Sequence, residues 1–238
     1  WDTNGKKYLD FIGGWAVCNL GHSHKAISKT LKKQSKKLIN SSPSFYNEPM
    51  LNYSKLLIKN TAFERVWFGN SGAEVNEAAV KLARKYGALN KDGAYEIITT
   101  KNGFHGRTLA MMSATGKDHW QGLFGPKEQG FIHVDFNDLE QVKESITDNT
   151  VAIMLEPIQG EGGVNPATKE YIVGLRKICD EHNILLIFDE IQTGFGRTGK
   201  LFAYEHYEIV PDIMTTAKGI GGGYPLSAIL TKEKLNIF

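Results

Sequence analysis

The chain has 238 residues, a length that permits one large domain or two modest ones with a substantial core. Because 28 basic side chains nearly balance 26 acidic ones, the bulk charge does not indicate a nucleic acid or a membrane surface as partner. No apolar run approaches the roughly 20 residues that a membrane-spanning helix requires.

The cysteine content indicates the kind of cellular compartment. Cys18 and Cys179 are the only two cysteines, which is too few for a disulfide framework and suits a reducing compartment. We therefore expect a cytoplasmic protein.

The first stretch predicts a β-hairpin over residues 1–11. Asn4-Gly5 is a strong two-residue turn, and the strand YLDF follows it. Because only two residues precede this turn region, we expect the natural chain to begin earlier. His22 and His24 come next, and local hydrogen bonding is the better expectation than a metal site because no third ligand lies nearby.

Two helices are predicted before the first buried strand. The run KTLKKQSKKL, residues 29–38, places its lysines on the wet face of an amphipathic helix. A turn-rich loop with Phe45 and Tyr46 separates it from a helix over about residues 50–60.

The stretch FGNSGAEVNEAAVKLARKYG predicts a strand, a loop and a helix. Ser71, Gly72 and Ala73 fall at the helix N-terminus, where free N–H groups and the helix dipole form a phosphate site. The alternative is an ordinary serine cap, with Glu74 complementing the dipole.

Strands and helices then alternate. AYEIITT, FIHVDF and VAIMLEP predict strands, and residues 139–146 and 169–183 predict helices. This alternation is typical of βαβ units and a mostly parallel sheet. YPLSAILT predicts one more strand, and KEKLNIF the start of a helix.

Loops at the strand ends carry polar side chains. KNGFHGRT offers Phe104 as an aromatic face and Arg107 as a carboxylate clamp. A packed phenylalanine and a surface arginine are the alternative. The later loop IQGEGGVNPAT carries Glu161.

Two further strand ends carry an acid and a lysine. Residues 184–188 form a continuous apolar run, as in a strand buried on both faces, and Asp189 follows it directly. Lys218 follows a second strand and precedes a glycine run that would let backbone approach a ligand. Each residue alone fits a cap, an ion pair or a phosphate contact. Together they suggest the lysine and acid that serve pyridoxal phosphate.

Six motifs in order give the sequence a resemblance to the class III, or ω-amino-acid, aminotransferases, and within them most closely to acetylornithine aminotransferases. They are YLDFIGGWAVCNLGHSH, FGNSGAEVNEAAVKLARKYG, FHGRT, EPIQGEGG, FDEIQTGFGRTG and AKGIGGGYPLSA. The resemblance implies an α/β fold: the large domain of a fold type I pyridoxal-phosphate-dependent transferase, with a mostly parallel central sheet and helices on both faces. It assigns residues 1–45 to an N-terminal segment and residues 46–238 to the large domain.

The resemblance also implies roles around pyridoxal 5′-phosphate. Lys218 would bind the cofactor covalently and later act as the base, while Asp189 would keep the pyridine nitrogen protonated. Gln192 would contact the phenolic oxygen and Phe104 would stack on the ring. The phosphate would bind to Ser71, Gly72 and Ala73.

The substrate side of the site is implied in the same way. Arg107 would clamp a carboxylate, Glu161 would be a gate acid that pairs with an arginine, and Trp15 and Tyr46 would line the entrance. That arginine, and a threonine supplied by a partner subunit, belong to segments that would follow Phe238, in or near a C-terminal small domain. We therefore expect this chain to be weakly active or inactive on its own.

The expected reaction is transfer of the ω-amino group of N-acetylornithine to 2-oxoglutarate, in arginine biosynthesis, by a homodimer with shared sites. Ornithine, 4-aminobutyrate or another ω-amine is the alternative donor, and Trp15 is a weak indication against ornithine. An aminomutase is a further alternative. So is a non-catalytic α/β module that binds a phosphorylated ligand, although it leaves Lys218 and Asp189 unexplained.

Overall fold

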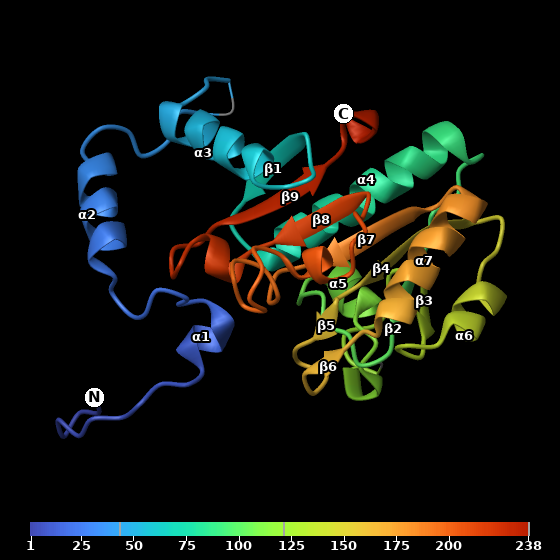
Figure 1. Ribbon diagram of the computed structural model, residues 1–238, viewed down its shortest axis with the longest axis horizontal. Coiled ribbons are helices and arrows are strands. Elements are labelled where there is room, and N and C mark those ends of the chain that lie inside the picture. Colours follow the sequence, from blue (N-terminus) through green and yellow to red (C-terminus); the bar gives the residue numbers. More distant parts are fainter. Residues whose placement is uncertain (43, 121, 238) are drawn as a thin grey trace.

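The computed structural model describes residues 1–42, 44–120 and 122–237. Its centre is a seven-stranded sheet in the order β1-β9-β8-β7-β4-β2-β3 (Figure 1). The strands are β1 (Arg65–Gly69), β2 (Glu96–Thr100), β3 (Phe131–Val134), β4 (Thr150–Leu155), β7 (Leu185–Asp189), β8 (Ile213–Thr216) and β9 (Ser227–Thr231). Neighbours from β8 to β3 are parallel, whereas β9 runs antiparallel to β8 and β1. The predicted mostly parallel sheet is confirmed.

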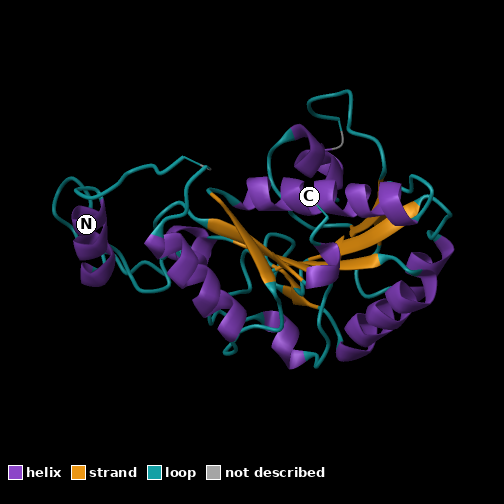
Figure 2. Ribbon diagram, turned by 90° about the horizontal axis from the view of Figure 1, so that it is seen from above, coloured by secondary structure: helices purple, strands orange, loops and turns teal. Residues whose placement is uncertain are grey.

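Side chains of the central strands alternate between two cores. In β7, Leu186 and Phe188 join one core, and Leu185 and Ile187 join the other. The first core includes side chains of α3 (Glu48–Lys59), α6 (Leu139–Glu144) and α7 (Lys169–His182), and the second those of α4 (Gly72–Asn90) and α5 (Leu109–Ala114). Figure 2 shows the strands between these helices. Burial on both faces explains why the apolar run in β7 is unbroken.

The N-terminal segment lies beside the sheet rather than on it (Figure 1). It contains α1 (Gly13–Ala16) and the predicted lysine-rich helix, α2 (Lys25–Gln34). None of the described residues before Leu57 is buried.

The predicted N-terminal hairpin is wrong in part. The turn forms, because Gly5 N donates to Asp2 O at 3.0 Å and Asp2 N donates to Lys6 O at 2.9 Å. No strand follows it within residues 1–42. A two-stranded hairpin is marginal without a further strand to pair with, and residues 1–42 contain none.

Several short elements were not predicted. They include α5, the antiparallel pair β5 (Ile158–Gln159) and β6 (Asn165–Pro166), and the 3₁₀ turns η1 (Asp118–Trp120), η2 (Ala203–His206) and η3 (Lys218–Ile220). The predicted helix start near the C-terminus is only a 3₁₀ turn, η4 (Glu233–Leu235). In the described ranges, no helix combines the length and the apolar character needed to cross a membrane.

Candidate active site

A cavity of about 530 Å³ opens where the parallel strands β2, β4, β7 and β8 reach their carboxyl ends. Open α/β sheets place their ligands at this edge. Ten predicted site residues line it: Trp15, Ser71, Gly72, Ala73, Phe104, Arg107, Glu161, Asp189, Gln192 and Lys218. Residues separated by up to 203 positions, Trp15 and Lys218, therefore meet in one cavity.

Tyr46 is the predicted site residue that the structure does not bring to this cavity. Its side chain is 83% exposed and lines a separate hollow together with residues of α2 and α3. The loop that carries it lies between α2 and α3, in a stretch where none of the described residues is buried.

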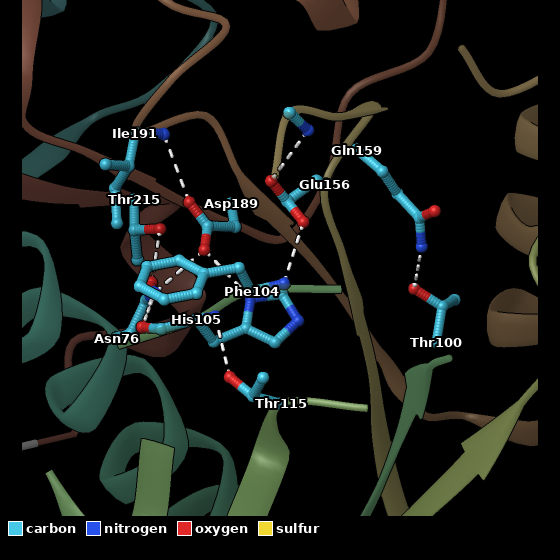
Figure 3. Close-up of polar contacts among 11 residues, drawn as sticks. Asn76, Thr100, Phe104, His105, Thr115, Glu156, Gln159, Asp189, Ile191 and Thr215 are labelled. Atoms are coloured by element: carbon cyan, nitrogen blue, oxygen red, sulfur yellow. Dashed lines mark hydrogen bonds and ion pairs between the residues drawn. The ribbon is translucent and has the colours of Figure 1, made fainter. Parts of the chain in front are cut away.

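The carboxylate of Asp189 lines the cavity at the end of β7, where Figure 3 shows its polar contacts. Its Oδ1 accepts a hydrogen bond from Ile191 N at 3.1 Å. Its Oδ2 lies 2.8 Å from Asn76 Nδ2 and 2.8 Å from His105 Nδ1. With 3% exposure, the carboxylate is held in one orientation by three groups.

Asn76 links this carboxylate to the neighbouring elements. Its amide donates to Asp189 Oδ2 and also to His105 O, at 2.7 Å. Its Oδ1 accepts a hydrogen bond from Thr215 Oγ1 of β8 at 2.7 Å. A buried asparagine with its polar atoms paired in this way stabilises one relative position of α4, β7 and β8.

His105 and Glu156 complete a buried charged cluster. Burial alone lowers the pKa of His105, but the hydrogen bond to Asp189 and its charge outweigh burial, so the pKa is raised overall. Burial, followed by the charge of Asp189, raises the pKa of Glu156 to about 7. Glu156 accepts hydrogen bonds from Phe104 N at 3.0 Å and Gly160 N at 3.3 Å (Figure 3).

Lys218 follows β8 and supplies the amine of the cavity. Burial lowers its pKa, although the charges of Asp189, Glu156 and Glu161 oppose this effect. A lysine whose ammonium form is destabilised in this way reaches the neutral, nucleophilic form at lower pH than an exposed one.

The N-terminus of α4 forms another wall. Ser71 caps the helix in a capping box: Ser71 Oγ accepts from Glu74 N at 3.3 Å, and Glu74 Oε2 accepts from Ser71 N at 2.7 Å. The serine cap foreseen as the alternative is therefore present. Gly72 and Ala73 still face the cavity, and the first N–H groups of a helix have no acceptor within it. The cap and an anion site can coexist here.

Gln192 is held close to the backbone of a neighbouring loop. A Cβ added at Gly160 would overlap the side-chain amide of Gln192. The missing side chain at residue 160 thus makes room for Gln192 at the cavity wall.

Charged and aromatic side chains lie together at the rim. The Arg107 guanidinium lies 5.1 Å from the ring centroid of Trp120, and Phe104 meets the same ring edge-on at 5.7 Å. Glu161 Oε2 lies 3.5 Å from Lys117 Nζ. Within the part of the chain that the structure describes, the partner of the predicted gate acid is therefore a lysine.

The histidine pair near the N-terminus makes local contacts, as expected. His22 Nε2 lies 2.6 Å from Asp10 Oδ2, and His24 Nδ1 accepts from Ala26 N at 3.3 Å, which caps α2. Over the described ranges, no three His, Cys, Asp or Glu side chains are grouped so as to hold a metal ion.

Sequence reasoning missed four members of the Asp189 cluster: Asn76, His105, Glu156 and Thr215. One signal was available for Asn76, which follows Val75 and lies three residues before Ala79 on the apolar face of α4. A polar residue in such a stripe needs a buried partner. The other three lie on or just after β2, β4 and β8, and they meet only because of the order of these strands in the sheet, which the sequence does not reveal.

Comparisons with known proteins agree with this geometry. The family model described as aminotransferase class-III matches residues 1–237. The acetylornithine aminotransferase 2 of Bordetella parapertussis is 55% identical over 237 residues, which cover 100% of this chain and 60% of that protein. The acetylornithine aminotransferase of Caldanaerobacter subterraneus is 52% identical, with 100% and 61% covered.

Solved structures show the same likeness. The ornithine aminotransferase of Toxoplasma gondii has a TM-score of 0.94 at 34% identity, covering 99% of this chain and 57% of that one. The N-acetylornithine aminotransferase of Stenotrophomonas maltophilia has a TM-score of 0.85 at 40% identity, covering 99% and 60%. The chain thus spans about three-fifths of the length of the relatives that it matches.

Proposed function

The chain belongs to the class III aminotransferase family, and from this premise we propose that it is the cofactor-binding part of a pyridoxal-phosphate-dependent aminotransferase. The proposed reaction moves the ω-amino group of N-acetylornithine to 2-oxoglutarate, a step in arginine biosynthesis. The observation that carries the proposal is the meeting of Lys218, Asp189 and the α4 N-terminus in one cavity. The names of the relatives support the donor.

The residues present fit pyridoxal phosphate. The cofactor carries an aldehyde, a pyridine nitrogen and a phosphate, and the cavity offers a partly desolvated amine, a fixed carboxylate and a helix N-terminus. Gly72 and Ala73 add backbone N–H groups beside Ser71. Phe104 adds an aromatic face.

When bound, pyridoxal phosphate supplies an electron sink for the charge left on a substrate carbon after proton removal. In our proposal Lys218 Nζ holds the cofactor and then takes up and returns that proton. Asp189 Oδ1 and Oδ2, fixed by Ile191, Asn76 and His105, keep a proton on the pyridine nitrogen. Gln192 would contact the phenolic oxygen of the bound cofactor.

The rim residues are proposed to select the substrates. Arg107 would bind a carboxylate through its planar guanidinium, which its stacking on Trp120 orients. Glu161 Oε2 lies 3.5 Å from Lys117 Nζ. Lys117 would therefore pair with Glu161 whenever a substrate carboxylate displaces Glu161 from the expected arginine. Trp15 would limit the width of the opening.

A sibling specificity is the second candidate. The high structural similarity to the ornithine aminotransferase of Toxoplasma gondii favours ornithine as the alternative donor. A module that only binds a phosphorylated ligand would not need a lysine with a lowered pKa.

We further propose a homodimer that works in the cytoplasm. Large apolar side chains on the N-terminal segment support self-association, among them Phe11 at 92% and Ile39 at 89% exposure. The free thiols of Cys18 and Cys179 support a reducing compartment.

The test begins with an absorbance spectrum of the purified protein with pyridoxal phosphate, before and after borohydride, followed by peptide mapping. We expect a reduced adduct on Lys218 and none in Lys218→Ala. N-acetylornithine, ornithine and 4-aminobutyrate are then compared as donors to 2-oxoglutarate. Absence of any adduct, also from a version extended at both ends, overturns the proposal. A preference for ornithine overturns the donor alone.

A further inference from the structure

The glycine run after Lys218 is a contact surface for the N-terminal segment. A Cβ at Gly219 would overlap Asn19 Nδ2, and one at Gly222 would lie 2.9 Å from Ile27 Cδ1. Neither glycine could therefore carry a Cβ unless the neighbouring side chain moved. These two glycines therefore accommodate side chains of residues 19–27, whereas the sequence had indicated a bound ligand.

Asn19 is the polar centre of this contact. Its Nδ2 donates to Phe195 O at 3.0 Å, and its Oδ1 accepts from Arg197 Nη2 at 2.7 Å. One amide thus joins the N-terminal segment to the loop after β7 and presses against the residue that follows Lys218. Both hydrogen bonds span more than 170 residues.

The backbone at Lys218 needs such support. Its φ is 50°, in the left-handed region that non-glycine residues seldom adopt. Two hydrogen bonds add to the support of the turn: Ile220 N donates to Ala217 O at 3.3 Å, and Gly221 N donates to Lys218 O at 3.2 Å. Tyr53 Oη donates to Ile220 O at 3.4 Å. On the other side of the turn, the Asn19 side chain packs against the backbone of Gly219.

We propose that Asn19 is a positioning residue for Lys218: by seating the N-terminal segment on Gly219, it holds the strained turn that directs the lysine amine into the cavity. The inference rests on the proposed function for the chemical role of the Lys218 amine, whereas the position of that amine follows from the structure. Asn19 itself does not line the cavity. It acts through the backbone of Gly219.

The test reads Lys218 in the cofactor-free protein. The rate at which a small amine-reactive reagent modifies Lys218 is followed against pH by peptide mapping. The midpoint in the wild type should lie below the ordinary lysine value of 10.5 because the amine is partly buried. The facing acids, Asp189, Glu156 and Glu161, are unchanged in every variant, so a change in the midpoint reports the position of the amine.

We expect Asn19→Ala to raise the midpoint toward the ordinary lysine value of 10.5, because the amine becomes more exposed to water. Asn19→Leu occupies similar space, makes neither hydrogen bond and adds no charge, so it should raise the midpoint too. Gly219→Ala, whose methyl displaces Asn19, should act in the same direction. Asn4→Ala, in the same segment, is the matched control and should leave the midpoint unchanged.

Unaltered midpoints in Asn19→Ala and Gly219→Ala, with both variants folded by near-ultraviolet circular dichroism, overturn the inference. If Asn19→Ala does not fold, Asn19→Leu and Gly219→Ala decide the question in the same assay. The outcome is separable from that of the proposed function. A raised midpoint without any borohydride adduct on Lys218 supports the positioning role and contradicts the aminotransferase.

Discussion

His105 and Asp189 face each other inside the protein, with Nδ1 2.8 Å from Oδ2 and side-chain exposures of 0% and 3% (Figure 3). A carboxylate is kept out of water here, which is favourable only when it is well paired. Asn76 and Ile191 satisfy the remaining sides of the carboxylate. The acid proposed to face the cofactor is therefore held by a buried network rather than by solvent.

This pair predicts a pH dependence of stability. Because the pKa of His105 is raised above its ordinary value of 6.5, its contribution to folding is complete below about pH 6.5 and is lost as pH rises through the raised value. In urea titrations, His105→Gln should remove this decline in the free energy of unfolding. The exposed His206→Gln should retain it. An identical decline in His105→Gln would contradict the prediction.

Glu156 predicts a second, lower pH window. Its pKa is raised from 4.5 to about 7, so the folded protein takes up a proton that the unfolded chain has released. Stability from this group is present below about pH 4.5 and is lost as pH rises to about 7, a change of roughly 3 kcal/mol at most. Glu156→Gln mimics the protonated acid and should reduce the slope over this range, part of which remains because burial also raises the pKa of Glu190 to about 7. The free energy of unfolding is measured by urea titration from pH 4.5 to 7.5. If its slope against pH is the same in Glu156→Gln as in the wild type, Glu156 does not carry this pH dependence.

Gly160 and Gln192 predict a non-additive pair. Gly160→Ala places a methyl on the Gln192 amide, which we expect to cost about 1–3 kcal/mol of stability by overpacking and to weaken cofactor binding. Gln192→Ala removes the obstacle, so the double variant should recover most of this stability. Gly122→Ala, in open space, is the control. If the stability changes of the two single variants simply add up in the double variant, as measured by thermal unfolding, the proposed overlap between residue 160 and Gln192 is wrong.

Glu190 predicts a large effect on stability away from the cavity. It is wholly buried and accepts hydrogen bonds from Ala203 N, Tyr204 N and Thr193 Oγ1, each at 2.7 Å. Glu190→Ala leaves these donors buried and unpaired, and should lower the free energy of unfolding by about 2–4 kcal/mol.

The control for Glu190 is an exposed acid. Glu208 pairs with Lys169 at 2.5 Å on the surface, and Glu208→Ala should change stability far less than Glu190→Ala, because solvent screens an exposed ion pair. Equal effects of the two substitutions in denaturant titrations would show that burial of Glu190 carries no weight.

Much of the architecture could be predicted from local pattern. Residues 184–188 are apolar without a break because β7 is buried on both faces, and Lys29, Lys32 and Lys33 are spaced for the wet side of α2. The strand-end rule placed Asp189 and Lys218 together, because parallel strands bring their carboxyl ends to one edge. The hairpin failed for the converse reason: a turn is local, but strands need partners.

The sequence by itself determined the alternation of strands and helices, the cavity edge and the lysine and acid that meet there, since these follow from periodicity and from chain direction. Only the tertiary structure decided which distant residues touch. Asn76 reaches Asp189 across 113 positions, and Asn19 reaches Phe195 across 176. Such contacts depend on strand order and on the path of the N-terminal segment, and neither leaves a periodic signal along the chain.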